Sequence, residues 1–195
     1  MARKRTTVPT KPNDARARRS VEAMRAAFLE LIEIKPLDDI LLRDITDAAG
    51  LSYATFFRRF ASKEDLLIDI ARGEVRNLME LSRQAILNKT SEGGKGMCEY
   101  VQNRRNLWKG LLTGGATSAM REEFIRAAQH MVDVRGRVNP AIPLDLAVGF
   151  TASGIFEIFA WWMRQPDDYP VGNVNKMFDA LIVNAIGRPL DLALD

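Results

Sequence analysis

Apolar residues along most of this chain recur every three or four positions, the spacing at which side chains share one face of an α-helix. Glycine- and proline-containing stretches separate these segments, and no alternating pattern with turn residues predicts a strand. The sequence therefore predicts an all-α protein. Its six longer helices are expected at residues 15–34, 63–87, 97–112, 118–134, 144–164 and 174–186.

Two shorter helices are expected within residues 41–60. Gly50 ends the first of them, because a residue without Cβ enters the left-handed backbone region at little cost. Ser52 stands at the N-cap of the second, where its hydroxyl can accept from free backbone amides. Phe56 and Phe60, four residues apart, share one face toward a core. Two short helices around a tight turn are typical of a helix-turn-helix that binds DNA.

The pattern also predicts how the chain is organised. Residues 1–14 are basic, show no helical period and are expected to form a disordered arm. Residues 15–62 are expected to form a three-helix DNA-binding head that contains the helix-turn-helix. A long helix from residue 63 joins this head to a larger helical body that extends to residue 195. A linker is expected at residues 88–96, which contain three glycines.

The charge is distributed unevenly along the chain, although the net charge is only +3. Residues 1–63 hold 13 Lys and Arg against 8 Asp and Glu, whereas residues 64–195 hold 15 against 17. The basic excess therefore lies with the helix-turn-helix. Binding to a polyanion requires this arrangement, because each neutralised phosphate releases counterions.

The sequence contains few residues that suit catalysis or metal binding. It has one cysteine, Cys98, and one histidine, His130, so neither an intrachain disulfide nor a metal site of the usual spacing is expected. No glycine-rich phosphate loop follows a strand, and no motif places a nucleophile beside its base. We therefore expect no catalytic residue, no metal and no cofactor, and an enzyme is only a remote alternative.

No segment suggests a membrane protein. The most apolar segment, residues 144–163, contains Asp145 and Glu157, and its longest uncharged run is shorter than the ~18–20 residues that span a bilayer. The N-terminus is charged without an apolar stretch behind it, so no secretory signal is expected. These observations predict a cytoplasmic protein without a membrane partner.

Three segments in register resemble the N-terminal signature of the TetR/AcrR family of bacterial transcriptional regulators: ITDAAGLS at 45–52, TFFRRF at 55–60 and SKEDLL at 62–67. The resemblance covers about residues 15–70. It implies a dimeric, sequence-specific repressor that binds double-stranded operator DNA and leaves it when a small-molecule effector binds the body. A ligand-independent regulator or activator controlled by a protein partner remains an alternative.

The resemblance also implies which residues contact DNA. Tyr53, Ala54 and Thr55 occupy base-reading positions, Arg58 can reach a phosphate or a guanine edge, and Lys63 holds the DNA backbone. Phe57 stands where the family usually has tyrosine, so a hydroxyl that would reach a phosphate is absent. The full expected set is Arg43, Ser52, Tyr53, Ala54, Thr55, Phe57, Arg58 and Lys63.

A dimer is expected because one helix-turn-helix contacts few bases, and operator specificity usually requires two half-sites. The apolar helix at residues 144–164 carries small residues that permit close helix approach, and the last helix is amphipathic. The expected interface residues are Gly149, Ala152, Ser153, Ala160, Trp162, Phe178, Leu181 and Ile182.

The resemblance further implies a cavity in the body for a small apolar or amphipathic effector. Glu157 is unusual there, because it is a carboxylate in the most apolar helix. It can face a cationic ligand, pair with an arginine of the partner chain or lie at an exposed edge, and we favour structural pairing. The candidate effector-binding residues are Trp108, Leu112, Phe124, Met131, Phe156, Glu157 and Trp161.

Overall fold

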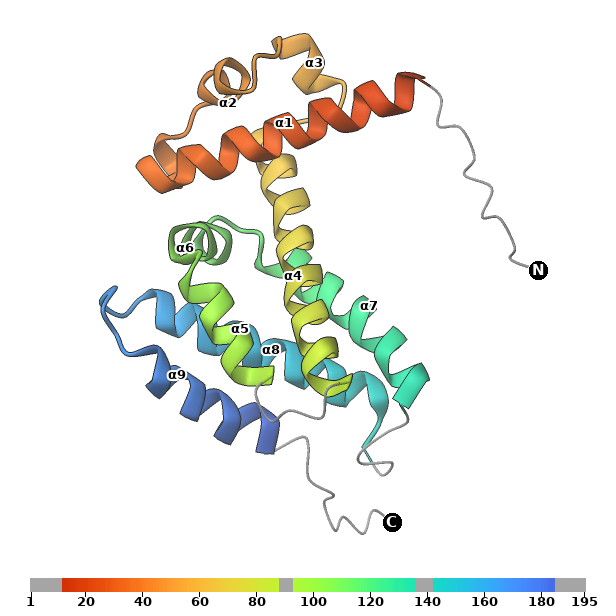
Figure 1. Ribbon diagram of the computed structural model, residues 1–195, viewed down its shortest axis with the longest axis vertical. Coiled ribbons are helices and arrows are strands. Elements are labelled where there is room, and N and C mark those ends of the chain that lie inside the picture. The colour runs from red at the N-terminus through yellow and green to blue at the C-terminus, as the bar shows by residue number, and fades with distance from the viewer. Residues whose placement is uncertain (1–11, 88–92, 136–141, 185–195) are drawn as a thin grey trace, which may run out of the picture. The chain divides into compact units, whose positions relative to one another are not determined.

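The computed structural model describes residues 12–87, 93–135 and 142–184, and every regular element within these ranges is helical (Figure 1). The expected all-α class is confirmed. The chain divides into two compact units, Met1–Leu66 and Leu67–Asp195. We call the first unit the head and the second the body. The expected basic arm lies mostly outside the described residues, since the first helix begins at Pro12.

The head is built around apolar residues that four helices bury together. Met24 and Phe28 of the first helix, Ile45 of the second and Phe56 of the third have no solvent-exposed surface. The rings of Phe56 and Phe60 lie 5.7 Å apart, so the aromatic pair predicted from their spacing forms part of this core. The elements of the head are α1 (Pro12–Ile34), the 3₁₀ turn η1 (Leu37–Asp39), α2 (Leu42–Ala48), α3 (Tyr53–Phe57) and the start of α4 (Lys63–Leu87).

The body is a helical bundle around α8, which packs against α6, α7 and α9, while α9 also packs against α5. A row of aromatic contacts runs through its core. The Phe159 ring lies 5.8 Å from Trp108, 6.4 Å from Trp162 and 5.9 Å from Phe178. After α4 the elements are α5 (Gly93–Gln102), α6 (Arg105–Thr113), α7 (Thr117–Arg135), α8 (Leu144–Met163), α9 (Val171–Phe178) and the π-helical turn η2 (Asp179–Val183).

The single helix expected at residues 97–112 is wrong, because the chain breaks between Gln102 and Arg105 into α5 and α6. The break sends two neighbouring arginines to different partners. Arg104 donates to Glu74 at 2.9 Å, and Arg105 donates to Asp167 at 2.8 Å. A continuous helix pattern in the sequence cannot reveal this division, since both partners are distant along the chain.

The expected linker at residues 88–96 is wrong at its end, because α5 already begins at Gly93. Gly94 serves close packing instead. A Cβ atom at this position would lie 2.7 Å from Asp179 Oδ1 and 3.0 Å from the Phe178 ring. The glycine therefore allows α5 to approach the junction of α9 and η2.

Helix α8 is long and apolar enough to cross a membrane by length and composition alone, as are the core helices of many soluble proteins. Eight of its residues are buried inside the body, among them Phe156, Phe159 and Trp162. Its apolar composition is therefore accounted for by its central place in the bundle.

Among the residues of the body that the structure describes, Glu74 and Glu123 are buried, and each is paired. Glu74 accepts from Tyr100 Oη at 2.8 Å and from Arg104, whereas Glu123 accepts from Arg76 at 3.1 Å and from Arg126 at 2.6 Å. Desolvation nevertheless raises the pKa of Glu74 above its usual range. These pairs hold α4 against α5 and α7, since removal of either partner would leave a buried charge uncompensated.

Candidate nucleic-acid interface

The turn between α2 and α3 is fixed by local hydrogen bonds. Gly50 adopts a φ of 62°, which lets the chain reverse after α2 and brings Leu51 N within 2.9 Å of Thr46 O. Ser52 then caps α3, because its Oγ accepts from Thr55 N at 3.2 Å. Local sequence thus fixes how the second helix of the motif is presented.

Helix α3 exposes an aromatic face. Tyr53 and Phe57, one helical turn apart, are 47% and 54% exposed, and Ala54 beside them is also exposed. The Phe57 ring lies edge-on to the buried Phe56 at 5.6 Å, which holds it in place without covering it. These side chains are available to base edges and thymine methyl groups in a major groove.

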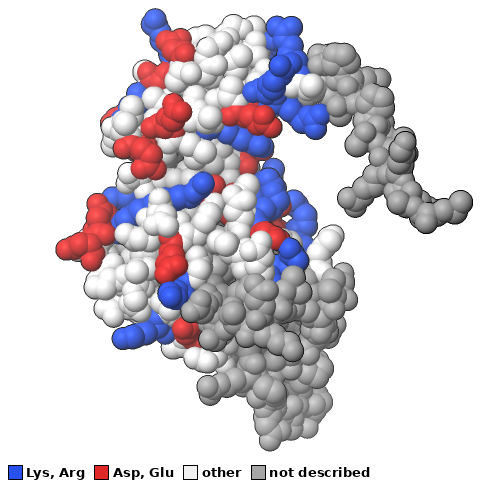
Figure 2. All heavy atoms as spheres, viewed as in Figure 1, with Lys and Arg blue, Asp and Glu red and all other residues white. Residues whose placement is uncertain are grey.

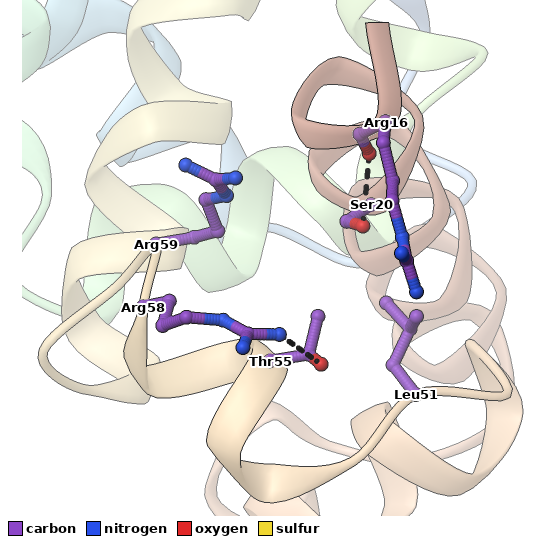
Figure 3. Close-up of a pocket in the computed structure, with 6 residues that line it drawn as sticks. All are labelled: Arg16, Ser20, Leu51, Thr55, Arg58 and Arg59. Carbon is purple, nitrogen blue, oxygen red and sulfur yellow. Dashed lines mark hydrogen bonds between the residues drawn. The ribbon is translucent and has the colours of Figure 1, made fainter. Parts of the chain in front are cut away.

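The side chains of Thr55 and Arg58 form a hydrogen bond with each other. Arg58 Nη2 donates to Thr55 Oγ1 at 2.8 Å, and the same hydroxyl lies 3.0 Å from Ser52 Oγ (Figure 3). Thr55 is only partly exposed, whereas Arg58 is exposed. The Thr55 hydroxyl is therefore already engaged in the free protein.

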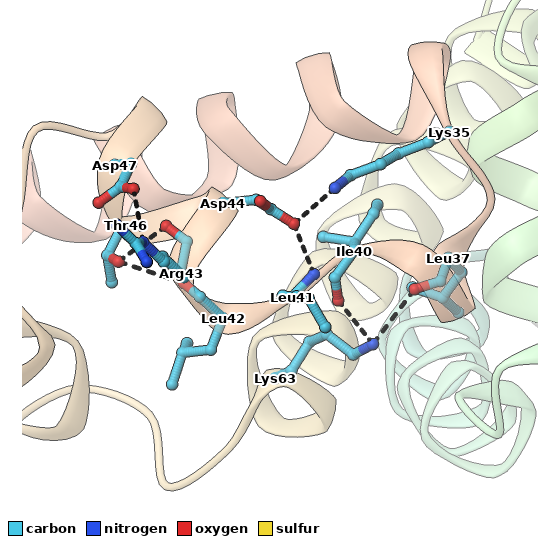
Figure 4. A network of polar contacts seen from close by, with 10 residues as sticks. All are labelled: Lys35, Leu37, Ile40, Leu41, Leu42, Arg43, Asp44, Thr46, Asp47 and Lys63. Carbon is cyan, nitrogen blue, oxygen red and sulfur yellow. Dashed lines mark hydrogen bonds and ion pairs between the residues drawn. The ribbon is translucent and has the colours of Figure 1, made fainter.

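Lys63 lies at the first residue of α4, where its ammonium closes the connection between α1 and α2. Its Nζ donates to Leu37 O at 3.1 Å and to Ile40 O at 2.9 Å (Figure 4). An ammonium has three N–H donors, so these bonds leave one for a phosphate. No residue type along the chain indicates this bonding, because both acceptors are backbone atoms more than twenty residues earlier.

A second lysine strengthens the same connection. Lys35 forms an ion pair with Asp44, whose carboxylate also accepts from Leu41 N at 2.8 Å at the start of α2 (Figure 4). The bond from Lys35, followed by that from Leu41 N, lowers the pKa of Asp44. The two ends of residues 35–44 are thus joined to each other, while Lys63 bonds to the middle of this segment.

Arg43 is more available than Lys63. Its Nε lies 3.4 Å from Asp47 Oδ2, and both side chains are largely exposed, so this ion pair adds little stability. Figure 2 shows further Lys and Arg side chains gathered at the N-terminal end of α1. The head therefore presents exposed basic groups on more than one of its helices.

The structure brings together only part of the expected effector set. Trp108, Phe124 and Phe156 are buried, and the last two rings meet edge to face at 6.0 Å. Leu112 and Trp161 are half-buried. The side chain of Met131 lies outside the described residues.

Glu157 does not belong with the buried residues of that set. Its side chain is 77% exposed and lies 3.5 Å from Arg164. The inclusion of Glu157 in an internal cavity was wrong, because its position on α8 faces away from the core. Of the three alternatives for this carboxylate, an exposed edge with an arginine of the same chain matches the structure.

Half of the expected dimer residues are enclosed within a single copy. Ala152, Trp162, Phe178 and Ile182 are buried in the core of the single chain, which leaves little of their surface for a partner. Ser153 and Leu181 are exposed, and Gly149 and Ala160 are half-buried.

Two apolar side chains on α8 that were not among the expected interface residues are exposed, Leu146 at 61% and Phe150 at 64%. A signal for them was present, since both share the helical spacing of the polar Ser153 and Glu157 and therefore lie on the outward stripe. Val183 of η2 is also exposed. Together with Leu181 they are the exposed large apolar side chains of α8 and η2, and we call this set of residues the α8–η2 surface.

Comparisons with known proteins agree with this architecture. Residues 25–70 match the family described as bacterial regulatory proteins, tetR family. An uncharacterized HTH-type transcriptional regulator of Haemophilus influenzae is 28% identical over 120 residues, which span 55% of this chain. The matched part is only 57% of that protein's length.

Solved structures extend the likeness to the whole fold. FadR of Thermus thermophilus, a TetR-family repressor solved with lauroyl-CoA, has a TM-score of 0.62 at 16% identity and covers 90% of this chain and 96% of its own. RolR, solved with resorcinol, has a TM-score of 0.63 at 17% identity, with 90% and 91% coverage. Residues 25–70 thus match the tetR family of bacterial regulatory proteins, and the chain shares the fold of solved TetR-family regulators.

Proposed function

We propose that this protein is a sequence-specific DNA-binding transcriptional regulator, acting as a dimeric repressor that a small-molecule effector releases from its operator. One observation carries the DNA-binding part: the capped, rigid turn presents Tyr53, Ala54 and Phe57 outward, beside exposed arginines. Groups of this kind suit base edges and phosphates respectively.

The proposed dimer rests on the α8–η2 surface. Leu146, Phe150 and Leu181 are each more than half exposed in the single chain, which is unusual for large apolar side chains gathered on neighbouring elements. A second copy related by two-fold symmetry would cover both surfaces at once. The two heads would then bind two half-sites whose centres lie about 10 bp, or a multiple of about 10 bp, apart.

The proposed effector is small and apolar or amphipathic. The relatives solved with resorcinol and with lauroyl-CoA bind ligands of this kind, and α6, α7 and α8 of this chain supply large apolar side chains such as Trp108, Phe124 and Phe156. An effector that binds one conformation of the body more tightly lowers operator affinity by the same coupling free energy.

Continuous aromatic packing around Phe159 favours a second candidate, a regulator whose body takes no ligand and responds to a protein partner instead. Thermal unfolding in the presence of a panel of small apolar and amphipathic compounds separates the two. A compound that raises the melting temperature and releases DNA supports effector control, whereas release of DNA by a protein alone supports the second candidate.

Selection of bound duplexes from a random pool by the full chain tests the proposed function. An enriched sequence with two related half-sites is expected. Tyr53→Ala should change the enriched sequence, while Arg43→Ala should weaken binding to every duplex alike. Binding that enriches no sequence and does not weaken with salt would contradict the proposal.

A further inference from the structure

A hollow of about 390 Å³ lies within the head, beside the helix that exposes Tyr53 (Figure 3). Two helices and the turn between α2 and α3 contribute to its walls. Three of its six lining residues are arginines, two carry hydroxyl groups and none carries a carboxylate. The lining residues are Arg16 and Ser20 of α1, Leu51 of the turn, Thr55 of α3, and Arg58 and Arg59 directly after α3.

We propose that this hollow binds a single phosphate group of the DNA backbone, and that Arg58 and Thr55 serve this phosphate instead of reading bases. The inference rests on the proposed function, because it assigns part of the DNA surface. The phosphate fixes the register of α3 on the duplex, and base recognition then falls to Tyr53, Ala54 and Phe57.

The three arginines of the hollow are available to bind an anion. Among the residues that the structure describes, no carboxylate pairs with Arg16, Arg58 or Arg59, and all three are exposed. Guanidinium groups gathered around one space repel each other, and a bound phosphate removes that repulsion. Their N–H groups match phosphate oxygens in a bidentate manner.

The Thr55–Arg58 bond directs one of these guanidinium groups. With Nη2 held at 2.8 Å from Thr55 Oγ1, the Arg58 side chain runs along the wall of the hollow rather than out from α3 (Figure 3). One of its five N–H donors is used in this bond, so four remain for a phosphate. The contact orders the arginine before DNA arrives, which lowers the entropic cost of binding.

Arg16 connects the phosphate to a different helix. It lies on α1, one turn before Ser20, whose Oγ donates to Arg16 O at 3.1 Å. A phosphate held by Arg16 on one side and by Arg58 and Arg59 on the other would link α1 to α3. Arg18 is also exposed on α1 but does not line the hollow, so it provides a matched control.

The experiment compares Arg16→Ala with Arg18→Ala in the full chain. Affinity for the selected duplex and for a scrambled duplex of equal length is measured from 50 to 200 mM salt. Arg16→Ala should weaken binding to both duplexes by the same factor, roughly tenfold, and lower the slope of log affinity against log salt by about 0.9. Equal effects of Arg16→Ala and Arg18→Ala would overturn the proposal.

Selection from a random pool with Arg58→Ala tests the reassignment of Arg58. The enriched sequence should remain that of the wild-type chain, although binding weakens. A changed sequence would return Arg58 to base reading and overturn this part of the inference. Circular dichroism checks that each variant is folded, and Arg16→Gln replaces Arg16→Ala if the latter is not.

Titration with inorganic phosphate at constant ionic strength distinguishes DNA phosphate from a free phosphate ligand. The arginine Nε–H resonances of the wild-type chain and Arg16→Ala are followed by NMR. A reduced salt slope without a phosphate response assigns the hollow to the DNA backbone. If the wild-type chain binds no duplex, the proposed function fails. In that case, a saturable phosphate response that is lost in Arg16→Ala would support a site for free phosphate in the hollow. The absence of any response would overturn the phosphate site altogether.

Discussion

Lys63 Nζ lies 2.9 Å from the carbonyl oxygen of Ile40, which joins the first residue of α4 to the chain just before α2. A second hydrogen bond, to Leu37 O, means that the ammonium holds two points of the α1–α2 connection. Lys63 was expected as a direct contact to the DNA backbone. Because two of its donors bond to the backbone, we expect Lys63 also to position α2 and α3 within the head, beside the one donor that is left for a phosphate.

Replacement of Lys63 by methionine tests this role, because methionine keeps much of the apolar stem and removes the donors. Lys63→Met should lower the local free energy of opening around α2 by about 1–3 kcal/mol, measured by hydrogen exchange of the Ile45 amide. Binding to all duplexes should weaken together. Arg43→Ala is the control and should change this free energy by less than about 0.5 kcal/mol. Unchanged exchange in Lys63→Met would contradict the positioning role.

Phe57→Tyr should strengthen DNA binding. The ring is 54% exposed, and a hydroxyl at its outer edge would supply the phosphate donor that the resemblance to the TetR/AcrR family implies at this position. Affinity for selected and scrambled duplexes should rise several-fold, roughly the worth of one hydrogen bond to a charged group. Fluorescence anisotropy of labelled duplexes measures this gain. Phe57→Leu, which keeps an apolar side chain without a hydroxyl, should show no gain, and equal gains in both variants would contradict the explanation.

Phe150→Glu should convert the proposed dimer to monomers at micromolar concentration. A carboxylate at this position would have to be buried against the second copy without a partner, which should weaken dimerisation by at least about 100-fold. Sedimentation velocity measures the change. Ile34→Glu is a matched control, since Ile34 is a large apolar residue of the head that is 77% exposed. The same sedimentation coefficient for Phe150→Glu and wild type would contradict the assignment of the α8–η2 surface.

Glu74 should make stability depend on pH in a direction opposite to that of most carboxylates. Its pKa is raised above the ordinary value of 4.5, so the folded protein binds this proton more tightly than the unfolded chain does. Its contribution to the free energy of unfolding is largest below pH 4.5 and is lost as pH rises through the raised pKa. Glu74→Gln lacks this loss and can still accept hydrogen bonds. The urea midpoint of Glu74→Gln minus that of wild type should therefore increase as pH rises. A difference that does not change with pH would contradict the prediction.

Local signals made the helix-turn-helix predictable. Gly50 and Ser52 act on atoms within a few residues, and the structure shows the turn and cap that their chemistry requires. The four-residue spacing of Phe56 and Phe60 was also sufficient to place both in the core.

Features that depend on atoms far away along the chain were not predictable. Lys63 donates to carbonyl groups, which every residue possesses, so no residue type in the sequence indicates its acceptors. Gly94 likewise resembled a linker residue, although the need for it comes from Phe178 and Asp179 far along the chain. On α8, the apolar pattern could not separate Trp162, buried by its own chain, from Phe150, which is exposed.

The placement of the aromatic residues gives the two units separate spectroscopic signals. All three tryptophans belong to the body, in α6 and α8, whereas the head contains Tyr53 and no tryptophan. Indole emission therefore reports the body alone, and Trp108 and Trp162 are both fully buried in the folded chain. The ring resonances of Tyr53 report the head. Unfolding, ligand binding and DNA binding can thus be followed separately in one unlabelled protein.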